Sequence, residues 1–326
     1  MVGMCNFLMN MIYFVTDCDG TVCHYDVEGD ELKSAHFSLP PSAGSGRVAL
    51  TSNKTIQLME SISEISALQM ICVSGMREAT MMQRYKYFPF IKYWICENGG
   101  RIFEVNGNEL IEISEWKSRF ETDSALSLEL SNFSQYLRHV GHKVDDGYLT
   151  MRRIKATNYA DILPLIPSSL KYTYNLGYLD IHVPYSGKLP AVKWLLSHLQ
   201  KRNNLQVEAM IENPEQSFYF MGDDDNDIEI ANDSRRAYIV RPFSAKMREF
   251  LREKGFSDVD NKSLHFNGDH DLHSTNENSV VTSAESGLML ESIPHYRYGK
   301  ITVAHRSKFA ATEDLLTLVI RDIKRT

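Results

Sequence analysis

Short apolar runs recur along the chain and alternate with stretches whose apolar residues lie three and four positions apart. The runs are rich in β-branched and aromatic residues, which is typical of buried strands. They lie at Ile12–Thr16, Gln69–Val73, Tyr93–Cys96, Ser217–Met221 and Ala237–Val240. Between the third and fourth runs, residues 191–199 have apolar side chains at helical spacing. Strands that alternate with helices predict an α/β fold, in which helices cover both faces of a parallel sheet.

One long stretch departs from this alternation. From about Gly100 to Asp180 the pattern shifts to short paired strands, separated by turn signals such as Asn106-Gly107-Asn108. We therefore predict that residues 100–185 form a separate α+β domain. It would be inserted into the parallel core, which would comprise residues 1–99 and 186–326.

Two polar segments interrupt the predicted core. Tyr25–Lys54 is turn-rich and predicts an exposed loop after the first strand. Residues 257–292 are rich in Asn, Asp, Ser and His and predict a flexible excursion. A short strand, Ile301–Ala304, and a closing helix with a single apolar stripe follow that excursion.

Composition excludes several classes of function. With 43% hydrophobic and 24% charged residues, the 326-residue chain is typical of a folded globular protein. Its formal net charge of −7 gives no attraction for nucleic acid or for an anionic membrane, and we expect neither as a partner. The basic run Arg152, Arg153 and Lys155 is interpreted as a solvated strand face rather than a substrate contact. No pattern assigns an oligomeric state.

Cysteine usage and the first apolar stretch predict a cytoplasmic protein. The five cysteines are odd in number and lack C-x-x-C spacing, which indicates reduced thiols rather than disulfides or a zinc site. The stretch Phe7–Val15 is too short to span a bilayer, and it lacks the basic start and cleavage site of a signal peptide. We interpret it as part of a buried strand.

The first candidate for chemistry is the motif Asp17-Cys18-Asp19-Gly20-Thr21, which directly follows a predicted strand. Ligands of open α/β sheets bind at the carboxyl ends of the strands, so both carboxylates should project into a crevice. One carboxylate could attack phosphorus while the other protonates the leaving oxygen. The alternative is a plain acidic turn in which the glycine makes the bend.

A second acidic motif, Gly222–Asp227 with sequence GDDDND, also follows a predicted strand. Acidic residues at a helix start favour the helix dipole, but four carboxylates in five positions exceed that need. If they converge with Asp17 and Asp19, like charges about 4 Å apart would repel by roughly 4 kcal/mol per pair at an effective dielectric of about 20. A divalent cation would remove this repulsion, and oxygen ligands favour Mg²⁺.

Two weaker signals complete the set. Ser74-Gly75 ends a predicted strand and could hold a phosphoryl oxygen, but taken alone the pair favours a plain turn. Lys188 opens the predicted helix around residues 191–199. Because a cation at a helix start opposes the dipole, another interaction should hold it there, and a phosphoryl group is one candidate.

The order and strand context of these four motifs resemble those of the haloacid dehalogenase superfamily. The likeness is greatest to its Cof-type and sucrose-phosphate phosphatases. Glu97-Asn98-Gly99-Gly100 and Asp180–Pro184 are similar to the segments that flank the cap domain in that family. The resemblance implies a Rossmann-like core, a cap made by the 100–185 insert, and hydrolysis of a small phosphorylated metabolite, a sugar phosphate being the favoured class.

Carried onto this sequence, the resemblance implies a role for each matching residue. Asp17 would be the nucleophile that forms an aspartyl-phosphate, and Asp19 the general acid and base. The remaining roles would be phosphate binding by Ser74, Gly75, Lys188 and Asn226, and Mg²⁺ binding by Asp17, Asp19 (through its backbone carbonyl), Asp223 and Asp227. Asp224 and Asp225 receive no role. A phosphomannomutase-like enzyme and a non-catalytic phosphometabolite-binding protein are the alternatives.

Overall fold

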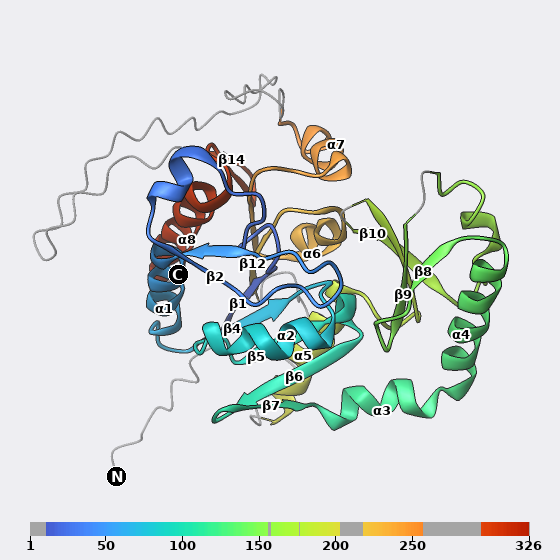
Figure 1. The fold of residues 1–326 in the computed structure, drawn as a ribbon. Helices are drawn as coiled ribbons and strands as arrows, with labels where there is room; N and C mark the ends of the chain where they lie inside the picture. Colours follow the sequence, from blue (N-terminus) through green and yellow to red (C-terminus); the bar gives the residue numbers. More distant parts are fainter. Residues whose placement is uncertain (1–10, 156–157, 176, 203–217, 257–294, 326) are drawn as a thin grey trace, which may run out of the picture.

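A computed structural model describes residues 11–155, 158–175, 177–202, 218–256 and 295–325 of the chain. A nine-stranded sheet forms its centre, in the order β14-β15-β13-β12-β1-β4-β5-β6-β7 (Figure 1). The six strands from β15 to β5 are parallel to one another. They are β1 (Ile12–Thr16), β4 (Leu68–Val73), β5 (Tyr93–Cys96), β12 (Phe218–Gly222), β13 (Arg236–Ile239) and β15 (Ile301–Ala304). The predicted α/β fold with a parallel sheet is confirmed.

Helices cover both faces of this sheet because successive strand residues point to opposite sides. On β1, Phe14 joins the core beneath α1 (Asn53–Ser63) and α8 (Lys308–Lys324). Its neighbours Tyr13 and Val15 join the core on the other face. Helices that contribute to that second core include α5 (Lys188–Arg202), α6 (Ile228–Asp233) and α7 (Ala245–Glu253). Two cores on one sheet give the three-layer arrangement of an α/β domain.

A second, four-stranded sheet lies beside the first and has the order β10-β11-β9-β8 (Figure 1). All of its strand pairs are antiparallel. Its strands are β8 (Lys143–Asp145), β9 (Met151–Lys155), β10 (Lys171–Asn175) and β11 (Tyr178–His182), and the helices of the same stretch are α3 (Ser114–Thr122) and α4 (Ser124–His139). Buried residues of α4 pack on this sheet in a core of their own, which includes Leu137 and Ile181.

The start of the predicted insert differs from the structure. The segment after Gly100 forms the hairpin β6 (Arg101–Asn106) and β7 (Glu109–Glu112), which pairs antiparallel with β5 at an edge of the large sheet. The Asn106-Gly107-Asn108 signal correctly marks the turn of this hairpin. The sequence pattern of paired strands does not reveal which sheet the strands join. The prediction therefore placed the start of the insert at residue 100, whereas the chain leaves the large sheet only after β7.

The segment expected to be an exposed loop after β1 is partly ordered and buried. It contains the hairpin β2 (His36–Ser38) and β3 (Leu50–Ser52), and Leu39 is only 2% exposed. The prediction of an exposed loop was wrong at these positions because a few apolar residues among many polar ones suffice to anchor it. The predicted excursion at residues 257–292 lies outside the described residues.

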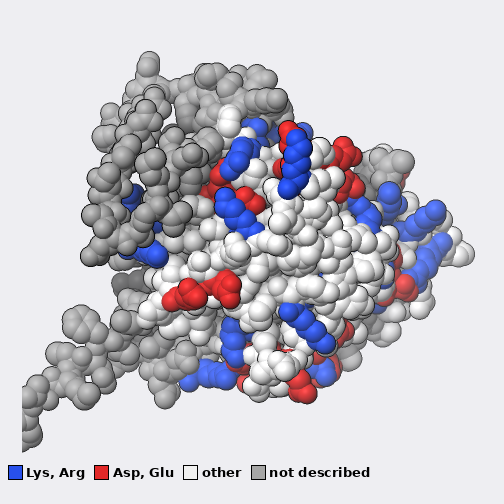
Figure 2. Space-filling view, turned by 60° about the vertical axis from the view of Figure 1, so that its left-hand side comes forward, with Lys and Arg blue, Asp and Glu red and all other residues white. Residues whose placement is uncertain are grey.

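The remaining strand and α-helix of the described residues are the edge strand β14 (His295–Tyr298) and α2 (Glu78–Arg84). On the face shown in Figure 2, basic and acidic side chains are interspersed rather than gathered by sign. Within the described ranges, no helix combines the length and the apolar character needed to cross a bilayer.

Candidate active site

Asp17, Lys188 and Asp227 form a buried cluster at the carboxyl ends of the central strands. Nζ of Lys188 donates to Oδ1 of Asp17 over 2.9 Å and to Oδ1 of Asp227 over 2.6 Å. Asp17 directly follows β1, and Asp227 follows β12. These two strands pair directly with each other. The Lys188 side chain is 2% exposed and those of the two aspartates are 6% and 0% exposed. The lysine at the helix start thus faces two carboxylates, which explains why it can oppose the helix dipole.

Asp223 lies against the loop that follows Asp17. The hydroxyl of Thr21 donates to its Oδ1 over 2.8 Å. A Cβ on Gly20 would lie 2.2 Å from its Oδ2, and this glycine has a φ of +89°, where other residues are strained. The loop therefore approaches the carboxylate this closely only with glycine at position 20.

Asp227 orients the acidic loop as well as Lys188. Its Oδ2 accepts hydrogen bonds from the backbone N–H groups of Asp223 and Asp224 over 3.1 and 3.2 Å. Protein donors thus occupy both of its oxygens. This side chain is better placed to hold the loop than to bind a metal directly. Asp225 accepts a hydrogen bond from Ser244, away from the cluster.

The charges of this cluster are unbalanced. One carboxylate oxygen each from Asp17, Asp223 and Asp227 lies within 4.8 Å of the others. Burial raises the pKa of Asp17, and the ammonium of Lys188 opposes that rise. Burial and then the carboxylates of Asp17 and Asp227 raise the pKa of Asp223. Burial alone would lower the pKa of Lys188, but the two carboxylates raise it. Three buried carboxylates beside one ammonium fit a divalent cation with oxygen ligands.

Asp19 points to a different set of partners. Its Oδ1 accepts hydrogen bonds from Nη1 of Arg84 over 2.6 Å and from the hydroxyl of Tyr25 over 2.8 Å. Nη2 of Arg84 also donates to the Tyr25 hydroxyl over 3.1 Å, which closes a triangle of three groups. The Asp19 side chain is 18% exposed, whereas the guanidinium that holds it is fully buried. Both bonds end on one oxygen, so neither occupies Oδ2.

Sequence reasoning missed Arg84 and Tyr25. A signal was present on α2, where Thr80, Met81 and Arg84 are the buried residues and share one helix face. An arginine at a position that continues a buried helix face needs an acidic partner, because burying an unpaired charge is strongly unfavourable. The sequence alone does not say which of many carboxylates that partner is.

Ser74 and Gly75 lie at the carboxyl end of β4, the strand next to β1. The Ser74 side chain is buried, and its hydroxyl accepts a hydrogen bond of 3.2 Å from the N–H of Met76. A Cβ on Gly75 would lie 2.2 Å from Nδ2 of Asn175 and 2.8 Å from Oδ1 of Asn98. The small sheet, which contributes Asn175, therefore meets the core directly above this turn.

Asn226 lies in the same contact region. Its Nδ2 donates to Oδ1 of Asn98 over 2.8 Å, and Nδ2 of Asn98 donates to Oδ2 of Asp180 over 2.6 Å. The resemblance implies that Asn226 binds phosphate, and in the structure its amide nitrogen is bonded to Asn98. Among the described residues, Oδ1 of Asn226 is buried without a hydrogen-bond partner.

Arg153 corrects the interpretation of the basic run as a solvated face. Its Nε and Nη2 each donate to Asp180 over 2.7 Å, one to each carboxylate oxygen. The Arg153 side chain is 15% exposed and Asp180 is fully buried. The paired charges stand on adjacent strands β9 and β11, directly opposite in register. A cross-strand partner of this kind is invisible until the pairing of the strands is known.

Comparisons with known proteins give matches only among solved structures. No family model and no curated protein matches the chain. The sucrose-phosphatase of Synechocystis, in complex with sucrose and phosphate, is 14% identical over 78% of this chain and 93% of its own, with a TM-score of 0.48. The C-terminal domain of Candida albicans trehalose-6-phosphate phosphatase is 14% identical over 74% of this chain and 91% of its own, with a TM-score of 0.47.

A third match is a haloacid dehalogenase-like hydrolase from Bacillus subtilis, 14% identical over 74% of this chain and 82% of its own, with a TM-score of 0.43. The chain is similar to each of these proteins over most of its length.

Proposed function

We propose that this chain is a Mg²⁺-dependent phosphatase that hydrolyses a small phosphomonoester, with sugar phosphates as the favoured class. The observation that carries the proposal is the buried Lys188 ammonium 2.9 Å from Oδ1 of Asp17, beside Asp223 and Asp227. A carboxylate held by an ammonium at the carboxyl end of a central strand, in an acid-rich site, suits attack on a phosphoryl group.

Asp17, Asp223 and the backbone carbonyl of Asp19 would hold the metal. Asp227 would orient the loop through the N–H groups that it binds. Bound there, Mg²⁺ would offset the charge of the carboxylates and of the incoming phosphoryl group. Oxygen-only ligands at this spacing agree with the preference of that cation.

The chain's own residues would then divide the reaction into two displacements. A carboxylate oxygen of Asp17 attacks phosphorus, the bond from phosphorus to the leaving oxygen breaks, and Asp19 gives that oxygen its proton. The product is an aspartyl-phosphate on Asp17 and a free alcohol. Asp19 next takes a proton from water, whose oxygen attacks phosphorus, and inorganic phosphate leaves with Asp17 restored.

The remaining residues would hold the phosphoryl group and the acid. Lys188 lies against the nucleophile and would neutralise phosphoryl oxygens, with Ser74 and Gly75 just after the neighbouring strand β4 as further donors. Asn226 would offer its amide from the other side. Arg84 and Tyr25 hold Oδ1 of Asp19, which leaves Oδ2 for proton transfer.

We also propose that the small sheet with α3 and α4 acts as a cap over this site. Its Asn175 and Asp180 reach Gly75 and Asn98 of the core, so it lies where the organic part of a substrate would extend. The four cysteines within the described ranges are buried and free, which supports a reducing compartment such as the cytoplasm.

The test is phosphate release from a panel of sugar phosphates and p-nitrophenyl phosphate, with Mg²⁺ or with EDTA. Wild-type protein is compared with Asp17→Asn and with Asp225→Asn, an acid-to-amide control in the same acidic motif. Release that requires Mg²⁺ and Asp17 but not Asp225 supports the proposal. Transfer of phosphate between sugar hydroxyls, with a requirement for a bisphosphate and little free phosphate, would indicate a mutase instead. Binding of the sugar phosphates without either reaction would indicate a binding protein.

A further inference from the structure

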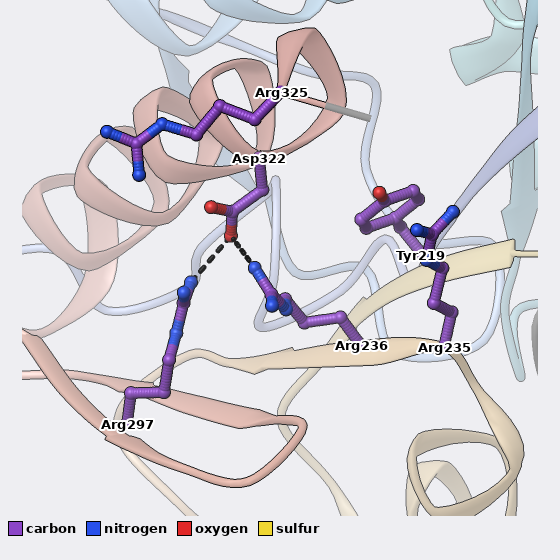
Figure 3. A pocket seen from close by; sticks show the side chains of 6 residues that line it. All are labelled: Tyr219, Arg235, Arg236, Arg297, Asp322 and Arg325. Atoms are coloured by element: carbon purple, nitrogen blue, oxygen red, sulfur yellow. Dashed lines mark hydrogen bonds and ion pairs between the residues drawn. The ribbon is translucent and has the colours of Figure 1, made fainter. Parts of the chain in front are cut away.

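A cavity of about 310 Å³ lies away from the acidic cluster, at the opposite ends of the central strands. Its lining residues are Tyr219, Arg235, Arg236, Arg297, Asp322 and Arg325 (Figure 3). Tyr219 is near the start of β12 and Arg236 begins β13, whereas Asp223 follows the end of β12. At about 3.3 Å per strand residue, Tyr219 and Asp223 are about 13 Å apart along the chain. The cavity is therefore separate from the proposed catalytic site.

Among the residues that the structure describes, the lining has four arginines and one aspartate, a formal charge of +3, in a chain whose net charge is −7. This concentration contrasts with the interspersed charges on the face of Figure 2. Like charges confined to one pocket repel, and the repulsion persists unless anions compensate it. The pKa of Arg321, on the same helix end, is lowered by burial and by the neighbouring charges of Arg325 and Arg297.

Asp322 compensates only part of this charge. Its carboxylate accepts from Nη2 of Arg297 over 2.5 Å and lies 2.7 Å from Nη1 of Arg236 (Figure 3). The hydroxyl of Tyr238 donates to the same oxygen over 2.7 Å. These bonds fix two guanidinium groups at the wall of the cavity. A role in stability alone would be complete with this buried aspartate and its two arginines.

Arg235 and Arg325 are not part of this group around Asp322. Both are exposed, and within the described part of the chain neither forms an ion pair. Arg235 instead lies over the ring of the buried Tyr219, with its Cζ 5.6 Å from the ring centroid. Figure 3 shows Arg235 beside this ring and Arg325 at the end of α8, on either side of Asp322. Among the described residues, the cavity thus presents two guanidinium groups that form no ion pair, one of them against the Tyr219 ring.

We propose that this cavity binds a small phosphorylated metabolite, at a site distinct from the catalytic one. Guanidinium groups match the oxygens of phosphate with paired N–H donors, and several of them together favour a dianion over a monoanion. The volume of about 310 Å³ lies at the lower end of the range for small-molecule sites and admits a phosphate group with a small organic part. The Tyr219 ring, over which Arg235 lies, helps to hold that guanidinium at the cavity.

The experiment is isothermal titration with inorganic phosphate and with glucose 6-phosphate, at constant ionic strength and in EDTA. Without metal, the carboxylates of the acidic cluster disfavour anions, so binding there is suppressed. Wild-type protein is compared with the double variant Arg235→Gln/Arg325→Gln. Both arginines are exposed and lack ion pairs in the described chain, so the double variant should remain folded, which the thermal midpoint checks. The expected result is one site per chain whose affinity falls about tenfold or more in the double variant.

Two controls make this result specific. Arg138→Gln/Arg202→Gln removes the same charge from exposed arginines elsewhere, each paired with a single acid, and should leave the affinity unchanged. Asp17→Asn alters the proposed catalytic site and should also leave it unchanged, whatever its effect on phosphate release. Equal affinity in wild type and the Arg235/Arg325 double variant would overturn the proposal. So would equal weakening in the Arg138/Arg202 control, or full displacement of phosphate by chloride at equal ionic strength, because each indicates unspecific attraction to positive charge.

Discussion

Nη1 of Arg84 donates a hydrogen bond of 2.6 Å to Oδ1 of Asp19, across 65 positions of the chain. The arginine side chain is fully buried, and its Nε donates to the backbone carbonyl of Pro40 over 3.1 Å. A guanidinium fixed at several atoms has little freedom to turn, and the carboxylate that it binds shares this restriction. Arg84 is therefore a positioning residue for the proposed general acid, supported by the segment that follows β1.

Tyr25→Phe should slow the reaction by disturbing the orientation of Asp19. The substitution removes one hydrogen bond to Oδ1 and leaves the Arg84 bond in place, a change of about 1 kcal/mol or roughly fivefold. We expect kcat for a sugar phosphate to fall by this factor with KM unchanged. The kcat for p-nitrophenyl phosphate should barely change, because its leaving group needs little protonation. Equal losses for both substrates would show that Tyr25 does not act through the acid. Tyr87→Phe, on an exposed tyrosine, is the control.

Lys188→Met should destabilise the protein far more than Lys193→Met. Both lysines are on α5 and each has an aspartate oxygen at 2.9 Å, but their side chains are 2% and 41% exposed. Removing one partner of a buried ion pair costs about 3–5 kcal/mol, whereas an exposed pair contributes about 1 kcal/mol or less. Urea unfolding in EDTA measures both losses. Similar losses for the two variants would mean that the Asp17–Lys188–Asp227 cluster is not held as a buried unit.

Asp223→Asn should have opposite effects on stability without and with Mg²⁺. In EDTA, burial and the carboxylates of Asp17 and Asp227 raise the pKa of Asp223, so its charge opposes folding and the amide should raise the melting temperature. With Mg²⁺ at about 100 times its Kd, the wild type gains about 2.7 kcal/mol, and a variant lacking a ligand gains much less. In thermal melts, the variant should therefore have the higher melting temperature in EDTA, and the wild type should have the higher one with Mg²⁺. If the same protein had the higher melting temperature in EDTA and in Mg²⁺, Asp223 would not be a metal ligand.

The parallel core could be predicted well because its strands are buried on both faces. β1 and β5 have the predicted bounds, and β13 differs from the prediction by one residue at each end. β12 ends one residue later than predicted, and its predicted first residue, Ser217, lies outside the described residues. The residues of a continuous apolar run are by themselves sufficient to predict a buried strand. The hairpin of β6 and β7 was predicted as paired strands, but the sheet that it joins depends on contacts with β5 that no local pattern encodes.

The same distinction between local and long-range information applies to the residues of the candidate site. Asp17 and Asp223 follow strands whose order in the sheet brings them together, so motif and strand context were sufficient to nominate them. Arg84 and Asn98 reach the site from a helix and from the turn after β5, and their partners are distant in sequence. Their roles depend on packing between elements, and a single sequence does not contain that information.

His24 should make the folded state sensitive to mild acid. The ring is 2% exposed, and its Nε2 lies 2.8 Å from the hydroxyl of Thr312 on α8. Burial, and then the positive charge of Lys308, lower the pKa of this histidine from 6.5 to about 3. In the unfolded chain the imidazole gains its proton near pH 6.5, whereas in the folded protein it stays neutral down to about pH 3. The contribution of His24 to the free energy of unfolding is therefore fully present above pH 6.5, and it is lost as the pH falls from 6.5 towards 3.

The loss can be measured against His24→Gln, in which an amide that does not titrate takes the place of the ring. Between pH 7.5 and pH 5 the free energy of unfolding of the wild type should fall by about 2 kcal/mol more than that of the variant. Other groups with lowered pKa values, such as the buried His182, titrate equally in both proteins and cancel in the difference. Urea unfolding at several pH values gives both curves. Parallel curves over this range would mean that His24 accepts a proton in the folded state, and that the contact between the loop after β1 and α8 opens readily enough to admit water.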